Sequence, residues 1–272
     1  MSSNDTAYLD LLEEVLEHGD ERPSRAGPTR SLFGSQLVLG PVHASFPIIS
    51  SRRIWQRPIL GELECFIKGT RRLTDFKEAG CNYWNANAQA WKPGANDVGR
   101  IYGVQWRQWR GPGGEHHDQL ARLVEGLRDD PAGRRHILAT WNPGELDEMC
   151  LPPCHILAQF YVSDDTLECC VTMRSVDVCL GLPADMVLYG ALLSLVAEEV
   201  GLKAGRLIFH LGDTHVYENH VDQAKSQLSR VLSPSQPKFF NAPGNSLFNF
   251  RGDKCGLDGY NPDAILSYTF NV

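Results

Sequence analysis

Several segments of the chain repeat apolar residues with the period of an α-helix. Residues 7–18 place Leu9, Leu12 and Leu16 close to that period and end at Gly19, a residue type that often follows the last helical turn. A mostly apolar run at 186–202 ends before Lys203, Ala204 and Gly205 in the same way. The pattern predicts helices at 7–18, 59–69, 117–131 and 186–202.

Shorter apolar runs bounded by Gly, Pro or polar residues are typical of β-strands. Residues 80–115 differ: they are rich in Gly, Asn, Trp and Pro with little periodicity, so we expect a long functional loop there. No internal repeat, low-complexity tract or linker divides the chain. We therefore predict one α/β domain over residues 1–272, with strands at 31–40, 46–53, 134–143, 154–165, 166–178 and 205–217.

Composition narrows the class of protein. The 272 residues are 42% hydrophobic and 22% charged, which fits a globular chain and not a disordered or fibrous one. No run approaches the ~20 apolar residues of a membrane span, and the acidic start of the chain is unlike a secretory signal, so we expect a cytoplasmic protein. A net charge of −7 argues against a nucleic-acid surface. The eight cysteines are expected to be thiols, without a zinc-finger spacing.

Cys154 is the first candidate for chemistry. It lies in the segment LPPCH at 151–155, where two prolines fix the backbone before it. A nucleophilic cysteine needs a pKa lowered by nearby cations, and Arg174, Arg134 and Arg135 are the candidates. Taken alone, the local sequence favours a buried, unreactive thiol, because free cysteine is among the most buried residue types.

Glu62 is the second candidate. It lies within the predicted helix 59–69, at the border of an apolar stripe formed by Ile59, Leu63 and Phe66. Burial there would raise the pKa of the carboxyl and suit it to proton transfer near neutral pH. The alternative is a helix residue that faces solvent.

Arginines and histidines supply further candidates. Guanidinium groups match phosphate oxygens, so Arg25, Arg134, Arg135 and Arg174 fit a phosphate clamp, with solvated surface charge as the alternative for each. The three histidines of HLGDTHVYENH at 210–220 lack the spacing of metal ligands. We therefore expect no metal and interpret them as hydrogen-bonding groups for a sugar.

These candidates lie in segments that match one family in order, from about residue 7 to the end of the chain. Together the segments resemble thymidylate synthase and its close relatives, the pyrimidine nucleotide hydroxymethylases. The resemblance implies an α/β (α+β) fold with a large mixed β-sheet flanked by helices, a homodimer formed through that sheet, and 5,10-methylenetetrahydrofolate as co-substrate without a metal. The matching segments are GELECFIKG (61–69), RIYGVQWRQWR (100–110), DDPAGRRHILATWNPGELDEM (129–149), LPPCHILAQFYV (151–162), MRSVDVCLGLPADMVLY (173–189) and HLGDTHVYENHVDQ (210–223).

The resemblance also implies catalytic roles. Cys154 resembles the nucleophile that adds to C6 of the pyrimidine, after which C5 can attack the one-carbon unit of the folate. Glu62, Tyr102 and His155 resemble the groups that handle protons around the base.

Binding roles follow from the same resemblance. Arg25, Arg174 and Ser175 resemble the phosphate ligands, although the arginine loop is one residue shorter here and leaves Arg22 as an alternative to Arg25. The remaining groups resemble arginines contributed by a partner subunit (Arg134, Arg135), ligands of the sugar 3′-hydroxyl (His215, Tyr217) and residues of the folate cleft (Trp84, Leu151, Asp177, Leu180, Gly181, Val272).

One departure changes the expected substrate. Thymidylate synthases carry LPFN where this chain has LPAD at 182–185, and the Asn is the residue that recognises uracil. At Asp185 a carboxylate accepts from the cytosine amine and shares a proton with N3, whereas facing uracil O4 it would cost about 1–3 kcal/mol. Asp185 therefore predicts dCMP, with a thymidylate synthase acting on dUMP as the alternative. Ser175 and the pair Arg134 and Arg135 match the deoxyribonucleotide pattern, which favours dCMP over CMP.

A second departure concerns the fate of the one-carbon unit. The family's second tryptophan after Trp84 is missing from the run Trp84-Asn85-Ala86-Asn87, and its Phe is Ala184. A looser, wetter cleft helps water compete with hydride transfer, so we expect 5-hydroxymethyl-dCMP and tetrahydrofolate. Methylation to 5-methyl-dCMP is the alternative, and a nucleotide-binding regulatory protein on the same scaffold is the non-enzymatic one. A hydroxymethylase would supply a modified nucleotide for DNA, most naturally in a bacteriophage-infected cell.

Overall fold

The computed structural model describes residues 3–231 and 236–271 and is built around a mixed six-stranded sheet with the order β1-β2-β8-β7-β6-β5. Neighbouring strands are antiparallel except for β7 and β8, which run parallel. This confirms the expected α/β class with a large mixed sheet. The strands of this sheet are β1 (Asp20–Arg22), β2 (Thr29–Leu39), β5 (Ile137–Ala139), β6 (His155–Ser163), β7 (Thr166–Asp177) and β8 (Lys203–Tyr217).

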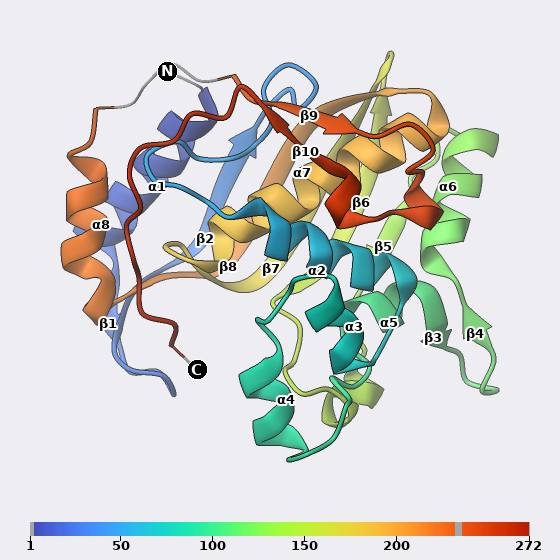
Figure 1. Ribbon diagram of the computed structural model, residues 1–272, viewed down its shortest axis with the longest axis horizontal. Coiled ribbons are helices and arrows are strands. Elements are labelled where there is room, and N and C mark those ends of the chain that lie inside the picture. The colour runs from blue at the N-terminus through green and yellow to red at the C-terminus, as the bar shows by residue number, and fades with distance from the viewer. Residues whose placement is uncertain (1–2, 232–235, 272) are drawn as a thin grey trace.

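Helices cover one face of the sheet and its ends (Figure 1). Helix α7 lies along β7 and β8, α2 packs on α7, and α1 packs on β2. The other helices are shorter and lie at the edges of the molecule. The helices are α1 (Ser3–His18), α2 (Gln56–Lys68), α3 (Leu73–Glu78), α4 (Asn85–Trp91), α5 (Tyr102–Gln108), α6 (Gln119–Asp129), α7 (Gly181–Val200) and α8 (Val221–Leu228).

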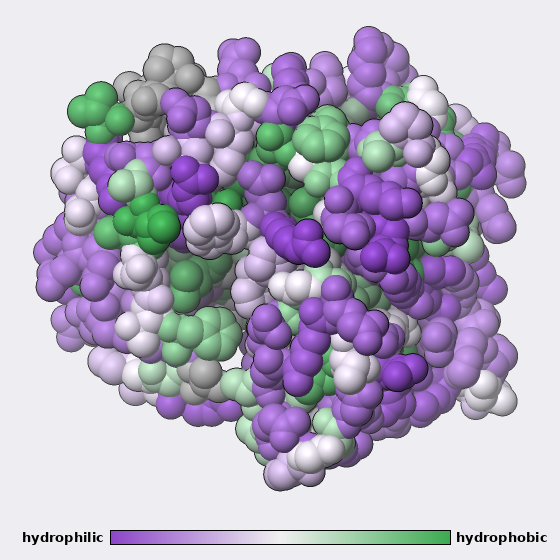
Figure 2. Space-filling view, viewed as in Figure 1, coloured by the Kyte–Doolittle hydropathy of each residue, from purple (hydrophilic) through white to green (hydrophobic). Residues whose placement is uncertain are grey.

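Helix α7 is the central element of the core. It is apolar on nearly every side and long enough to span a membrane, but 72% of its most apolar window is buried within the protein, as in a helix that forms part of a protein core. The face seen in Figure 2 is mainly hydrophilic, with hydrophobic residues gathered where the C-terminal segment crosses it. Two small hairpins complete the fold: β3 (Trp109–Arg110) with β4 (His116–His117), and β9 (Lys238–Asn241) with β10 (Cys255–Asp258).

The structure confirms the four predicted helices and most strands, but it corrects two predictions. Residues 46–53 form no strand: the segment is largely buried, and the Ser50 N–H bonds the carboxylate of Asp5 at 2.6 Å instead of a neighbouring strand. Residues 80–115 are not a single irregular loop, because they contain α4, α5 and the β3–β4 hairpin.

The pairing of the central strands is interrupted at Gly212. Met173 and Ser175 of β7 pair with Leu211 and Asp213 of β8, but Arg174 and Gly212 between them do not pair. A Cβ atom at Gly212 would lie 2.6 Å from the Arg174 carbonyl oxygen, so only glycine permits this close approach. Beyond the interruption, β7 and β8 end in polar residues that open into a cavity.

Candidate active site

Two cavities meet beside Cys154. The larger one, of about 570 Å³, lies against the ends of β7 and β8, and the smaller one, of about 310 Å³, lies between α2, α4 and α7. Leu151, Cys154, Gly181 and Asp185 line both cavities. The thiol therefore sits where two ligands bound in adjoining spaces would touch.

The backbone of Cys154 is held on both sides. Its N–H donates to the Tyr102 hydroxyl at 2.8 Å, and its carbonyl oxygen accepts from the Arg174 N–H at 2.9 Å. The Arg174 guanidinium is itself anchored, since Nε donates to the Pro153 carbonyl at 2.7 Å and Nη2 to the Pro152 carbonyl at 3.1 Å. The two prolines thus present carbonyl groups that aim this guanidinium at the thiol, with Nη2 4.0 Å from Sγ.

The pKa of Cys154 differs from the expectation of a thiol acidified by cations. Burial raises the pKa of Cys154, and the nearby Asp185 charge adds to the rise, while Arg174 and the Tyr102 hydroxyl oppose it. Arg134 and Arg135 do not help, because both are exposed and neither lines either of the two cavities beside Cys154. In the unliganded chain the thiol is therefore protonated at neutral pH.

Glu62 projects from α2 into the smaller cavity and not into solvent. Its Oε1 accepts a hydrogen bond from Trp84 Nε1 at 2.8 Å. Burial raises the pKa of Glu62 from 4.5 to about 7, and the Trp84 bond only partly offsets the rise. The carboxyl is therefore enclosed in the cavity and does not face solvent, and a pKa near 7 suits it to exchange a proton near neutral pH.

His155 follows Cys154 at the start of β6 and is fully enclosed. Tyr102 stacks on its ring with centroids 4.0 Å apart, and Tyr189 of α7 lies 2.7 Å from Nδ1. Burial lowers the pKa of His155 from 6.5 to about 3, so the imidazole is neutral. A neutral imidazole can pass hydrogen bonds but holds no charge in this site.

Asp185 lies on the first turns of α7, in the wall shared by the two cavities. Its Oδ1 is 3.8 Å from His155 Nε2. Burial, followed by the charge of Glu62, raises the pKa of Asp185 well above its usual range. A carboxyl whose pKa is raised in this way holds its proton more readily, and in the protonated form it can act as both donor and acceptor toward a ligand.

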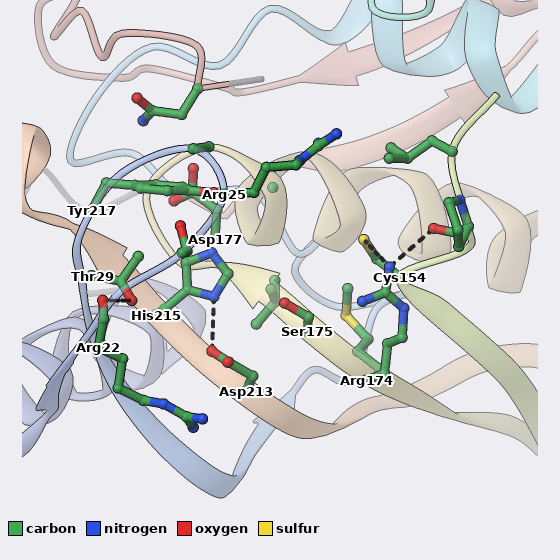
Figure 3. A pocket seen from close by; sticks show the side chains of 18 of the residues that line it. Arg22, Arg25, Thr29, Cys154, Arg174, Ser175, Asp177, Asp213, His215 and Tyr217 are labelled. Carbon is green, nitrogen blue, oxygen red and sulfur yellow. Dashed lines mark hydrogen bonds and ion pairs between the residues drawn. The ribbon is translucent and has the colours of Figure 1, made fainter. Parts of the chain in front are cut away.

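The far end of the larger cavity is built by alternating residues of one sheet face (Figure 3). Ser175 and Asp177 of β7 lie beside Asp213 and His215 of β8 in register. The Asp213 carboxylate accepts from His215 Nδ1 at 3.0 Å, which leaves Nε2 for a ligand, and also from Ser31 Oγ at 2.9 Å.

Arg22 at the end of β1 and Arg25 in the loop between β1 and β2 line the same cavity. In Figure 3 the Arg25 side chain extends over the cavity toward Cys154 and Arg174, whereas the Arg22 side chain points the other way. This orientation favours Arg25 over Arg22 as the anion ligand. Arg25 and Arg174 thus face one space from opposite sides, an arrangement suited to a phosphate group.

The chain matches the thymidylate synthase family over residues 6–272. The chain belongs to this family. Thymidylate synthases and their relatives transfer a one-carbon unit from methylenetetrahydrofolate to a pyrimidine nucleotide, and the family typically forms dimers. A nucleotide and a folate are therefore the ligands that the two adjoining cavities have to receive.

The described residues that were expected to contact folate are divided between the two cavities. The walls of this cavity are mainly apolar and include Trp84, Leu151, Leu180 and Gly181, four of the residues expected to contact folate. Asp177 lines the larger cavity, where its Oδ1 accepts from the N–H groups of Cys179 and Leu180. Val272 lies outside the described residues, while Phe270 of the same C-terminal segment reaches the smaller cavity.

The sequence pattern did not single out several residues of this site. Asp213 orients His215, and its only local signal is its position two residues earlier on the same strand face. Tyr189 contacts His155 across the core, a contact between residues 34 apart that no local pattern indicates. Tyr83 and Phe270 in the smaller cavity were also missed, since each comes from a segment without periodicity.

The metal interpretation of the histidine-rich segment finds little geometric support. His215 is engaged with Asp213, and His220 Nε2 bonds the Thr269 carbonyl at 2.7 Å. Within residues 3–231 and 236–271, the one grouping of metal-ligand types is Asp177, Cys179 and His220, whose ligand atoms lie within 4.8 Å of one another. Because its carboxylate already accepts two backbone N–H groups, we assign it no metal.

Proposed function

We propose that this family member transfers the one-carbon unit of 5,10-methylenetetrahydrofolate to C5 of dCMP and that water captures it. The products are 5-hydroxymethyl-dCMP and tetrahydrofolate. The observation that carries the proposal is the carboxyl of Asp185 beside Cys154, whose pKa burial raises well above its usual range, at the position where thymidylate synthases carry the Asn that recognises uracil.

Cytosine fits a protonated carboxyl for a chemical reason. When the Cys154 sulfur bonds to C6, the ring electrons move toward N3, which in cytosine carries no hydrogen and is basic. Asp185 gives its proton to N3 and accepts a hydrogen bond from the C4 amine, so the negative charge of the thiolate ends on Asp185. Uracil N3 already carries a hydrogen and cannot take this proton.

The thiol needs a base and a cation at the moment of attack. The phosphate of the bound nucleotide would lie between Arg25 and Arg174, and Arg174 is also the cation nearest to the sulfur. Glu62, with its pKa near 7, is suited to take and return protons on the C5 side of the base. Tyr102 positions the thiol through its hydrogen bond to the Cys154 N–H, and the His155 ring stacked on Tyr102 forms the wall behind it. His215 and Tyr217 bind the sugar 3′-hydroxyl.

Water capture is supported by the walls of the folate cavity. Asn87 and Ala184 line it at positions where the resemblance implies a tryptophan and a phenylalanine. Smaller and more polar walls admit water to the exocyclic methylene carbon, which then gains a hydroxyl as the Cys154–C6 bond breaks. The retained Trp84 is the feature that favours the alternative product, 5-methyl-dCMP, because it is the tryptophan shared with the synthases.

A homodimer would complete the site. Arg134 and Arg135 are exposed just before β5, away from this chain's own cavities, which suits a contribution to a partner's phosphate site. The sheet face opposite the helices exposes Val38 and Tyr161, which alternate with buried residues of β2 and β6, at 45% and 60%, an apolar surface suited to a second copy. We propose a cytoplasmic enzyme without nucleic-acid or membrane partners.

The decisive experiment is the product mass after incubation of the protein with methylenetetrahydrofolate and either dCMP or dUMP, with Cys154→Ser as the inactive control. We expect a hydroxymethyl group on dCMP and no rise in dihydrofolate absorbance. A methyl group on dCMP would keep the base assignment and refute water capture. Modification of dUMP alone would refute the role of Asp185.

A further inference from the structure

Asp185 and Tyr189 lie one turn apart on α7, with the His155 ring between them. The Tyr189 hydroxyl is 2.7 Å from His155 Nδ1, and Asp185 Oδ1 is 3.8 Å from Nε2. This row of a phenol, an imidazole and a carboxyl is buried, and it ends at the proposed base-binding group.

The direction of the Tyr189 hydrogen bond follows from its surroundings. The ring packs edge-on against Trp106 and Phe209, and the described residues offer the hydroxyl no partner other than His155. If Nδ1 carried the hydrogen, the phenol would accept that bond and leave its own buried O–H without an acceptor. The phenol therefore donates to Nδ1, and the hydrogen of the neutral imidazole resides on Nε2.

We propose that Tyr189 is a positioning residue that fixes His155 as the Nε2–H tautomer, so that His155 presents a hydrogen-bond donor to Asp185. The consequence for the reaction rests on the proposed function, because only with cytosine does Asp185 become a carboxylate during the reaction. A separation of 3.8 Å leaves no room for a bridging water, and catalytic hydrogen bonds commonly shorten when substrate binds.

The Nε2–H group of His155 and the other groups that face Asp185 have opposite effects on the pKa of Asp185. Glu62 of α2 and the thiol of Cys154 resist a second negative charge, and the Tyr102 hydroxyl of α5 is the remaining titratable group packed there. An Nε2–H group is the contact that favours the Asp185 carboxylate in this surrounding. Tyr189 thereby sets how readily Asp185 surrenders its proton to N3.

The test is the variant Tyr189→Phe, which keeps the ring and removes the donor. Its control is Tyr260→Phe, which removes the same phenol hydroxyl outside both cavities. The Tyr260 hydroxyl donates to the Ile49 carbonyl and accepts from the Ile54 N–H. Imidazole ¹⁵N spectra of selectively labelled protein, with His155 assigned by the signal lost in His155→Gln, report the tautomer without any turnover. Activity on dCMP is measured across pH in parallel.

We expect the free wild-type protein and Tyr260→Phe to show an unprotonated Nδ1 and a protonated Nε2, and Tyr189→Phe to show a mixture. Loss of the donor should lower kcat for dCMP about tenfold, as expected for one hydrogen bond to a charged group. It should also move the alkaline limb of the kcat/KM profile to higher pH, because Asp185 then holds its proton more tightly.

Three outcomes decide between the proposals. A protonated Nδ1 in the wild-type protein overturns the inference. Equal losses in kcat at every pH, with the limb unmoved, also overturn it, because a merely structural role for Tyr189 predicts that result. The expected tautomer in a protein that modifies neither nucleotide supports the positioning of His155 and refutes the function proposed above.

Discussion

Replacing Asp185 with Asn changes one oxygen into an NH2 group and leaves the shape of the side chain intact. The amide still forms hydrogen bonds, but it cannot give a proton to N3 of cytosine. The substitution also removes a carboxyl whose pKa burial and Glu62 hold well above its usual range. The variant therefore isolates the acid function of Asp185 from its packing in α7.

The size of the effect follows from the two roles of the carboxyl. Loss of a general acid lowers kcat for dCMP by about 10²–10⁴-fold. For dUMP, the amide can always donate to O4 and accept from N3–H, whereas the carboxyl can do so only while it holds its proton, so the gain is at most about 1–3 kcal/mol, or about 5-fold to 150-fold in kcat/KM. The ratio of the two specificities is thus expected to shift by at least about two orders of magnitude toward dUMP.

The assay is the initial rate of product formation by mass spectrometry with each nucleotide at saturating methylenetetrahydrofolate. Asp185→Ala is the matched control, because it lacks both the acid and the amide and should act poorly on both nucleotides. Undiminished turnover of dCMP by Asp185→Asn would refute the assignment of Asp185 as the proton donor to N3.

Three further variants test other parts of the site. Cys154→Ser should lower kcat by at least about 10³-fold while dCMP still binds, measured by single-turnover kinetics and calorimetry, and a retained rate would exclude Cys154 as the nucleophile. Glu62→Gln should remove the limb near pH 7 from the kcat profile. Because the folded pKa is raised from 4.5 to about 7, wild-type stability falls as pH rises through that window, and Glu62→Gln should abolish this fall in denaturant titrations. Gly212→Ala should cost about 1–3 kcal/mol of unfolding free energy through the contact with the Arg174 backbone, whereas Gly144→Ala, with only a 3.6 Å neighbour, should be neutral.

Local periodicity predicted the elements that bury their own stripe of apolar side chains. It located α7 but began it at 186 instead of Gly181, whereas the helix has Pro183 in its first turn. Proline is tolerated in the first turn of a helix, where its missing N–H has no partner to lose. The prediction of a strand at 46–53 was wrong although the segment begins with apolar residues and is largely buried. Asp5 and other distant groups take the backbone hydrogen bonds that a strand would use.

The site was predictable where chemistry has a sequence pattern and not where it depends on distant contacts. Cys154 and Glu62 were found from their residue types and surroundings, and both lie at the cavities. The pKa of Cys154 was not predicted correctly, because burial raises it more than Arg174 lowers it, and only the folded chain reveals the burial. Asp213 gains its role from Ser31, which is 182 residues away along the chain and beside it in the sheet.

The close approach of the two backbones at Gly212 fixes the distance between two parts of the proposed nucleotide site. On one side of it stands Arg174, whose N–H holds the carbonyl of Cys154, and on the other stands Asp213, which aims His215. The distance between the Cys154 sulfur and the proposed sugar site therefore depends on the direct contact between the backbones of β7 and β8 at Arg174 and Gly212. If the proposed function holds, a ligand that is longer or shorter between its base and its sugar would miss one of the two ends, so the site would select for the length of the nucleoside as well as for its base.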